Sequence, residues 1–544
     1  MELSRKDCEI LPGKRGFLTA TVVGEDGAEL YLHSLYDPFR EAQSHVPTCV
    51  EEATLVFLGS GLGYHIPLTL AANPGVKRLV LVERYPELAA AAAAGITDTA
   101  VRVEIVTGLS DLPPAETLPP DLDSAFLRIV PHPPSLRANP AWYAGYHAAV
   151  ATAGRERRRS EPAGGKALTI LFLYGGYYGQ RECIRGLQAL GHRVISVDYR
   201  NGEVGTISVL QNSLVRERPD LLFSVNMRGL DHRGVVGEMM VRTGIPLAVW
   251  FVDSPEFILS GGTLPPPAAT TFFLWDQSYL PQVEALGYRS FSLPLAADPT
   301  LVEAAQPVAG FRSRISFVGN SLVSDFLARL AEKFPHTVAT RELMAAGVGA
   351  ILAQRGNQLA ALEKVIAGSG IPFSREELLF FRAYAVHSAT TRYRTMLLER
   401  LLPHGLTFFG DPPGWRAIFG EGIDARADVH YFAETPAVYA SSELNFNATS
   451  LQMPQAVNQR VFDVPLCGGF LLTDRQEALW ELFRDDEVAQ YEGVDDLAEK
   501  ALYYLARPAV REKITAKARR RVLAEHTYER RMGELLRLLN SPGT

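Results

Sequence analysis

Residues 168–199 read LTILFLYGGYYGQRECIRGLQALGHRVISVDY. An apolar run comes first, a glycine-containing turn follows it, and an amphipathic helical segment leads into a second apolar run. This order and length are typical of one βαβ unit. The stretch therefore predicts an α/β domain built on a parallel sheet.

Two other stretches begin in the same way. They are TLVFLGSGLGYHIPLTLA at residues 54–71 and RISFVGNSLVSDFLARLAEKF at residues 314–334. In each, an apolar run is followed by a glycine-containing turn and a helical segment, which is how nucleotide-binding α/β units begin. Three Rossmann-like units are therefore expected in one α/β chain.

The chain is too long for a single hydrophobic core, since its 544 residues exceed the size at which chains divide into domains. Residues 151–166 are polar and contain a Pro-Ala-Gly-Gly step, so we expect a linker there. Apolar residues at helical spacing predict a helical insert over 324–404. The predicted units are an N-terminal domain at 1–150, a second at 167–305, a third at 306–530 and a helix end with a tail at 531–544.

Composition excludes several classes of function. The net charge of −7 argues against nucleic-acid binding, which needs a basic surface. Four cysteines without a CxxC spacing and histidines without a ligand pattern predict no disulfide framework and no metal site. No apolar run approaches the roughly 20 residues that a bilayer requires. We expect a cytoplasmic enzyme that needs no cofactor, with an oligomeric state that the sequence does not indicate.

The most informative segment is SSELNFNATSLQMPQAVNQRVFDVPLCGGFLLTDRQEALWELF, residues 441–483. A helix carrying Arg460 and Asp463 is predicted to run into Gly468 and Gly469 before a short strand. Helix N-terminal N–H groups and glycines suit phosphate oxygens, an arginine can balance a diphosphate, and an acid can hold ribose hydroxyls. The alternative is that Asp463 faces solvent and the glycines only end the helix.

The run NQRVFDVPLCGGFLLTD resembles the signature of the CgeB-like glycosyltransferases, within the GT-B enzymes that have a group 1 type C-terminal domain. VHYFAETPAVYASSELNFNATS and the helical segments after residue 491 resemble the same family, so that the resemblance covers roughly residues 165–540. It implies an α/β GT-B architecture, in which two Rossmann-like domains face a cleft. Residues 167–305 would form the acceptor side and 306–530 the nucleotide-sugar side.

The resemblance also implies a donor site. Asp463 should contact the ribose, and Gln455 stands eight positions earlier, where many retaining relatives have an acid. The predicted donor-binding residues are Gly319, Asn320, Asn447, Gln455, Arg460, Phe462, Asp463, Gly468, Gly469 and Phe470. The donor would be a nucleotide-diphosphate sugar, with a UDP-sugar favoured over a GDP- or dTDP-sugar, and the acceptor a protein or a cell-surface glycan.

On the acceptor side, Gly175, Gly176 and Tyr177 end a predicted strand, where ligands of such sheets bind. Asp253 in AVWFVDSPEF also ends a strand and is a candidate base for the acceptor hydroxyl. The alternative is that Asp253 caps a turn. The family resemblance implies a further cleft position for Asn226.

The N-terminal unit contains a second candidate nucleoside site. The turn GSGLG supplies Gly59, Gly61 and Gly63, and Glu83 ends the next predicted strand. This order resembles S-adenosylmethionine-dependent methyltransferases, and LHSLYDPFREA at 32–42 resembles the N-terminal region of motility-associated-factor glycosyltransferases. The alternatives to sugar transfer are therefore methyl transfer by this domain and a non-catalytic sugar-nucleotide scaffold.

Overall fold

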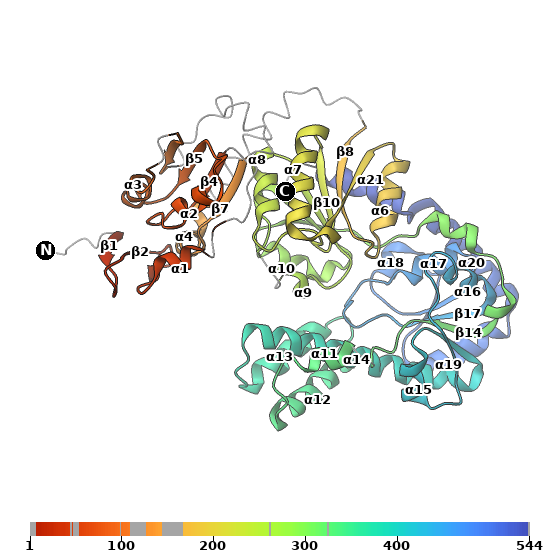
Figure 1. Cartoon of the computed structure of the whole chain (residues 1–544). Helices are drawn as coiled ribbons and strands as arrows, with labels where there is room; N and C mark the ends of the chain where they lie inside the picture. The colour runs from red at the N-terminus through yellow and green to blue at the C-terminus, as the bar shows by residue number, and fades with distance from the viewer. Residues whose placement is uncertain are drawn as a thin grey trace.

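The computed structural model describes residues 7–43, 46, 54–97, 100–108, 127–143, 167–259, 263–323 and 326–541. The predicted linker at 151–166 lies outside these residues. The described chain forms two six-stranded sheets, one four-stranded sheet and one three-stranded sheet. The first three are parallel throughout and are accompanied by helices, which confirms the α/β class (Figure 1).

The first six-stranded sheet has the order β13-β12-β11-β10-β8-β9. Every residue of β10, β11 and β12 is buried, as expected for parallel strands covered on both faces. Its strands are β8 (Thr169–Tyr174), β9 (Arg193–Asp198), β10 (Leu221–Val225), β11 (Leu247–Phe251), β12 (Thr270–Leu274) and β13 (Arg289–Ser292). Its helices are α6 (Gln180–Ala189), α7 (Gly202–Glu217), α8 (Val235–Thr243), α9 (Pro255–Leu259) and α10 (Leu280–Glu284).

The second six-stranded sheet has the order β16-β15-β14-β17-β18-β19, the doubly wound order of dinucleotide-binding folds. The direction of winding changes between β14 and β17. Its strands are β14 (Ser313–Val318), β15 (Leu406–Phe409), β16 (Asp424–Arg426), β17 (Ser442–Asn447), β18 (Leu471–Asp474) and β19 (Ala489–Tyr491). Its helices are α15 (Pro412–Phe419), α16 (Thr435–Ser441), α17 (Arg460–Leu466), α18 (Leu479–Leu482), α19 (Val494–Leu505) and α20 (Pro508–Glu525).

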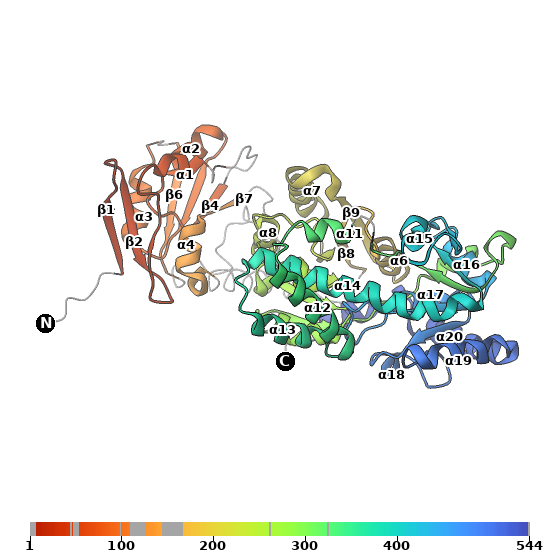
Figure 2. The same cartoon turned by 90° about the horizontal axis from the view of Figure 1, so that it is seen from below.

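A group of helices is inserted between β14 and β15: α11 (Phe326–Ala331), α12 (Val338–Ala353), α13 (Gln358–Ser369) and α14 (Arg375–Leu401). A capping box starts α14, since Ser374 and Glu377 each bond the other's backbone N–H. With 27 residues, α14 is about 40 Å long. Figure 2 shows it extending from the insert toward α17 and the second sheet.

The N-terminal unit is a third, smaller parallel sheet with the order β6-β5-β4-β7. Figure 1 shows it at one end of the molecule, beside α8 of the first large sheet. Its elements are β4 (Thr54–Leu58), β5 (Arg78–Val82), β6 (Arg102–Val106), β7 (Leu127–Pro131), α2 (His65–Ala72), α3 (Pro86–Ala94) and α4 (Pro133–Ala138). An antiparallel sheet of β1 (Cys8–Pro12), β2 (Leu18–Val23) and β3 (Glu29–Tyr31) precedes it, with α1 (Pro38–Gln43). The extra Rossmann-like unit is therefore present.

The end of the chain returns to the first large sheet. After α20, Thr527 forms a bridge with Ala297, and α21 (Tyr528–Leu539) packs against α6. A Cβ atom at Gly186 of α6 would lie 2.7 Å from the Tyr528 carbonyl oxygen, so the two helices are in close contact. The predicted boundary between 530 and 531 falls inside α21.

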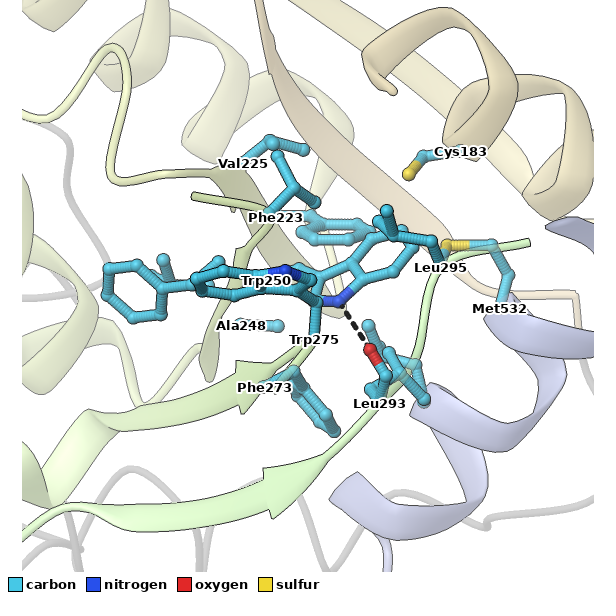
Figure 3. Close-up of a cluster of buried hydrophobic side chains, with 14 of the residues drawn as sticks. Cys183, Phe223, Val225, Ala248, Trp250, Phe273, Trp275, Leu293, Leu295 and Met532 are labelled. Carbon is cyan, nitrogen blue, oxygen red and sulfur yellow. Dashed lines mark hydrogen bonds between the residues drawn. The ribbon is translucent and has the colours of Figure 1, made fainter. Parts of the chain in front are cut away.

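The core of the first large sheet centres on Trp250, whose side chain is fully buried (Figure 3). Its indole Nε1 donates a hydrogen bond to the Leu293 carbonyl oxygen at 2.9 Å. Cys183 from α6 and Met532 from α21 belong to the same cluster. The returning C-terminal helix thus completes this core.

The described part of the chain contains no helix with the length and apolarity that a bilayer crossing requires.

We predict that Trp250→Phe lowers the free energy of unfolding by roughly 2–3 kcal/mol, because it leaves a cavity and an unpaired buried carbonyl. Urea unfolding of the full chain, followed by circular dichroism, should show an earlier transition. The control is Val204→Ala on α7, where the side chain is 69% exposed. Equal transitions for the two variants would contradict this account of the core.

Candidate functional site

Loops at the carboxyl ends of the two large sheets are tied together. Asp276, after β12, accepts hydrogen bonds from the backbone N–H groups of Gln455 (3.0 Å) and Ala456 (2.9 Å). Tyr279 donates to the carbonyl oxygen of Gln452 at 2.8 Å in the same loop, which leads from β17 to α17. Ligands of open α/β sheets bind at carboxyl ends, so this junction is the expected position of a site.

The turn after β14 lies against the first residue of α17. Gly319 has φ +158°, and a Cβ atom there would lie 2.9 Å from a terminal guanidinium nitrogen of Arg460. The Trp415 indole donates to the Gly319 carbonyl oxygen at 3.0 Å and fixes the turn. The structure therefore brings Gly319 and Arg460 together at the point where the winding of the sheet reverses.

The turns after β14 and β15 each contain a residue in an uncommon backbone conformation. Leu322 and Asp411 have φ values of 68° and 48°. The Asp411 carboxylate accepts hydrogen bonds from the hydroxyl and the backbone N–H of Ser321. Asn320 is exposed beside Gly410 of the β15 turn. Such conformations persist where the surrounding structure over-determines them, so this edge is rigid.

Arg394 of α14 belongs to the same site, although sequence reasoning missed it. Its side chain is 8% exposed, and it donates to the Asn320 carbonyl oxygen at 3.5 Å. The guanidinium carbons of Arg394 and Arg460 lie 6.0 and 5.9 Å from the centre of the Phe317 ring. Burial and the neighbouring Arg460 lower the pKa of Arg394 to about 10.

Among the described residues, no carboxylate lies within ion-pair distance of Arg394 or Arg460, and no hydrogen bond uses Nε of Arg394. A buried cation is normally paired, because removing it from water is costly. Two guanidinium groups beside a glycine turn are therefore chemically suited to an anion, and phosphate oxygens match guanidinium geometry. The sequence signal for Arg394 is an arginine four residues after Thr390 on the buried face of a helix.

Asp463 lies in the first turn of α17 and is 1% exposed, so the expected alternative of a solvent-facing carboxylate is wrong. Its oxygens accept hydrogen bonds from Tyr431 (2.8 Å) and Gln459 (2.9 Å). Burial raises the pKa of Asp463 to about 8, against the lowering effect of these two bonds. The carboxyl group is thus occupied by the protein's own side chains.

The structure does not place Gly468, Gly469 and Phe470 with Gly319. These residues follow α17 and precede β18, whereas Gly319 follows β14. In a parallel sheet, the start of one strand and the end of another lie at opposite edges. Gly468, with φ +79°, ends α17 instead, and Phe470 packs against Tyr504. Their predicted approach to the diphosphate is therefore wrong.

Three other residues that were predicted to bind the donor are buried or half-buried within the protein. Asn447 is fully buried and bonds the side chains of Thr473 and Asn458. Phe462 is fully buried in the core of the first large sheet. Gln455 has a half-buried side chain, in the loop that Asp276 holds. Asn447 and Phe462 therefore support the site without facing it.

On the other side, the structure brings Tyr177, Asn226 and Asp253 together at the ends of β8, β10 and β11. Asp253 Oδ2 accepts hydrogen bonds from the Asn226 amide at 2.8 Å and from the Tyr177 hydroxyl. The Arg228 guanidinium lies 3.7 Å from the centre of the Tyr177 ring. Burial and Asp253 raise the pKa of Tyr177 to about 12, so its hydroxyl remains a donor near neutral pH.

The glycine turn after β8 shapes this cluster. A Cβ atom at Gly175 would lie 2.2 Å from the Tyr199 ring, and Gly176 has φ +77°. The Gln180 side-chain oxygen accepts from the backbone N–H groups of Gly175 (3.0 Å) and Tyr177 (2.9 Å). Both glycines are thus required by the backbone path that delivers Tyr177 to Asp253.

In the N-terminal unit, Glu83 is fully buried and accepts hydrogen bonds from the backbone N–H groups of Ser60 (2.8 Å) and Gly61 (3.0 Å). Burial raises its pKa. A Cβ atom at Gly59 would lie 2.5 Å from an atom of α4, and one at Gly63 would lie 2.8 Å from an atom of α3. The glycines serve close packing here, and the predicted second nucleoside site stays a prediction.

In the part of the chain that the structure describes, no group of three or more His, Cys, Asp or Glu side chains is arranged to hold a metal ion.

The buried carboxyl of Asp463 predicts a pH dependence. Because its folded pKa is about 8 and its ordinary value is 3.8, the protonated Asp463 carboxyl stabilises the fold fully at pH values below 3.8, and this contribution is lost progressively as pH rises from 3.8 to about 8. Asp463→Asn should therefore raise the thermal midpoint at pH 8.5, where a loss of several kcal/mol is complete, by at least roughly 4 °C, with a much smaller effect at pH 5.

Differential scanning calorimetry at both pH values measures the difference. The exposed Asp485→Asn is the matched control and should follow the wild type. An equal effect of Asp463→Asn at both pH values would contradict a raised pKa.

Residues 392–537 match a family model described as glycosyl transferase-like, which spans well under half of the chain. No curated protein sequence matches the chain. Sucrose-phosphate synthase from Thermosynechococcus elongatus is similar in structure at 11% identity and a TM-score of 0.41, covering 68% of this chain and 99% of its own. The Anabaena protein HepE in complex with UDP-glucose has 12% identity and a TM-score of 0.41, with the same coverage. Trehalose 6-phosphate synthase from Burkholderia multivorans has 13% identity and a TM-score of 0.31, covering 90% and 98% of the two chains.

Proposed function

We propose that the protein is a glycosyltransferase that moves a sugar from a nucleotide-diphosphate donor, with UDP-sugars favoured, to a hydroxyl of a protein or cell-surface glycan. The observation that carries the proposal is the pair Arg394 and Arg460 beside Gly319, with no carboxylate of the described residues within ion-pair distance of either guanidinium. Both arginines lie within the matched residues 392–537.

The donor diphosphate would occupy the space between the β14 turn and the N-terminus of α17. Gly319 lacks a side chain, so phosphate oxygens can approach its backbone. Arg394 and Arg460 would stabilise the charge that develops as the nucleotide diphosphate leaves. Their mutual repulsion, which already lowers the pKa of Arg394, is relieved by an anion between them.

Asp463 keeps its proposed contact with the donor ribose, although Tyr431 and Gln459 now occupy it. Donor entry would replace the Tyr431 hydroxyl by a ribose hydroxyl of the same chemistry. With a pKa of about 8, Asp463 is protonated near neutral pH and adds no negative charge beside the diphosphate. The proposal thus requires a movement of Tyr431 and not of α17.

Asp253 is the proposed base. Both hydrogen bonds that it accepts from side chains use Oδ2, and among the described residues none uses Oδ1. Oδ1 would take the proton from the acceptor hydroxyl as its oxygen bonds the anomeric carbon. The bond from that carbon to the diphosphate breaks at the same time, and the nucleoside diphosphate leaves. Tyr177 and Asn226 would hold Asp253 in position for this step.

Arg394→Met and Arg460→Met should each weaken UDP binding at least about tenfold, or about 1.4 kcal/mol, because each removes a charge that contacts the diphosphate. Isothermal titration calorimetry with UDP measures this. Arg392→Met, an exposed position on the same helix, is the matched control and should bind UDP as the wild type does. Undiminished affinity in both site variants would remove the donor assignment.

Asp253→Asn should lower the rate of sugar transfer by about 10²–10⁴-fold and leave UDP affinity unchanged, since the change removes a base and keeps the shape. The measurement is UDP release from UDP-glucose and other UDP-sugars with cell extract as the acceptor source. Asp198→Asn, at the end of the edge strand β9 of the same sheet, is the matched control. Full turnover by Asp253→Asn would exclude Asp253 as the base, and donor binding without any turnover by the wild type would favour the scaffold alternative.

A further inference from the structure

A cavity of about 310 Å³ lies between the first large sheet's helices and the helical insert. Glu256 of α9 and Gln282 of α10 line it from one side. Glu363 of α13 and Arg382 of α14 line it from the other, with apolar walls that include Leu359. No part of the proposed donor site or of the Asp253 cluster lies among these residues.

The charges in this cavity do not balance. Arg382 holds Glu363 in a two-point ion pair, with N···O distances of 2.7 and 2.5 Å. Its third nitrogen is 3.5 Å from a carboxylate oxygen of Glu256. Two carboxylates therefore share one guanidinium, so the cavity carries one excess negative charge when both are ionised. The Glu256 side chain is 19% exposed, so this charge is poorly screened by solvent.

One lining residue of the cavity is close to the proposed base in the chain. Glu256 follows Asp253 by three residues, so their Cα atoms lie within about 11 Å of each other. A substrate whose hydroxyl meets Asp253 could therefore reach the cavity with a group one side-chain length away. One wall of the cavity thus belongs to the domain that carries the proposed base.

One ridge of α14 connects the cavity with the arginine pair. Arg382, Val386, Thr390 and Arg394 follow one another at intervals of four residues, so they form a ridge that winds by about a third of a turn around α14. Arg382 and Val386 line the cavity, and the Thr390 hydroxyl accepts from the Leu451 N–H at 3.0 Å. The helix rises about 18 Å from Arg382 to Arg394. A rigid element therefore fixes the cavity relative to the donor site.

We propose that this cavity is an acceptor subsite for a lysine or arginine side chain of a polypeptide acceptor. The proposal rests on the proposed function, because it names the acceptor class of the same reaction. The excess carboxylate selects a cation. The apolar wall, with Leu359, Leu362 and Val386, suits the methylene stem that carries the charge in these side chains. An amino sugar offers a cation without such a stem.

Ligand-observed NMR titration of the full chain tests the subsite with three probes. N-acetyl-lysinamide carries both the stem and the charge, N-acetyl-norleucinamide the stem alone, and glucosamine the charge alone. We expect the lysine probe to bind at least about tenfold more tightly than either of the others. Equal binding of the norleucine probe would overturn the proposal, and tighter binding of glucosamine would overturn it in favour of a glycan acceptor.

Two variants locate the binding. Glu256→Gln should weaken the lysine probe at least about fivefold. Gln282→Glu adds a carboxylate at an exposed position of the cavity and should tighten binding without any effect on folding. Glu342→Gln is the matched control, because Glu342 lines a separate hollow between α12 and α13. Unchanged affinity in Gln282→Glu would overturn the assignment even if Glu256→Gln failed to fold.

A parallel UDP titration of the wild type separates the two proposals. Lysine-probe binding without UDP binding would reject the donor site, and with it the acceptor role of the cavity. UDP binding without lysine-probe binding would reject the subsite alone.

Discussion

The central constraint in this structure is the placement of two guanidinium groups, Arg394 and Arg460, beside Gly319 with no carboxylate partner among the described residues. The two positive charges repel each other, more strongly where water is excluded, and Arg460 contributes to the lowered pKa of Arg394. The fold therefore has to hold both arginines by other contacts. The turn after Gly319 is fixed by Trp415, and its Ser321 carbonyl accepts a hydrogen bond from Thr391 at 3.1 Å. A site that is kept positive against its own repulsion is prepared for an anion.

The helical insert holds one of the two charges. Before α13, Arg355 forms an ion pair with Asp474 at 2.7 Å, and Asp474 stands at the carboxyl end of β18. Arg382, farther along, contacts Glu256 of the first large sheet. The insert therefore contacts both large-sheet domains. These contacts hold α14, and with it Arg394, in position as long as the two domains stay together. The helices inserted between β14 and β15 therefore supply a side chain, Arg394, to the candidate site.

Local sequence patterns predicted the strands, turns and helices that carry the candidate site. The apolar runs and glycine turns placed β8, β14 and their turns correctly, because these features depend on neighbours in the chain. Arg394 was missed because three helices, α11 to α13, lie between Gly319 and the helix that carries Arg394. The burial of Asp463 depends on Tyr431, 32 residues earlier. Gly468 was predicted beside Arg460 because the two residues are close in sequence. They lie at the two ends of α17, which runs from the carboxyl end of the sheet back to the start of β18.

The protonation of Asp463 bears directly on the arginine pair. An ionised carboxylate three residues after Arg460 would offset one of the two positive charges and repel a diphosphate. Burial between Tyr431 and Gln459 keeps the pKa of Asp463 near 8, so the carboxyl is neutral through most of the physiological range. Burial and Arg460 lower the pKa of Arg394, whereas Asp474 raises it. Glu182 and Asp298 of the first large sheet's side also raise the pKa of Asp463, so the protonation of this carboxyl depends on how completely α17 is buried against that sheet.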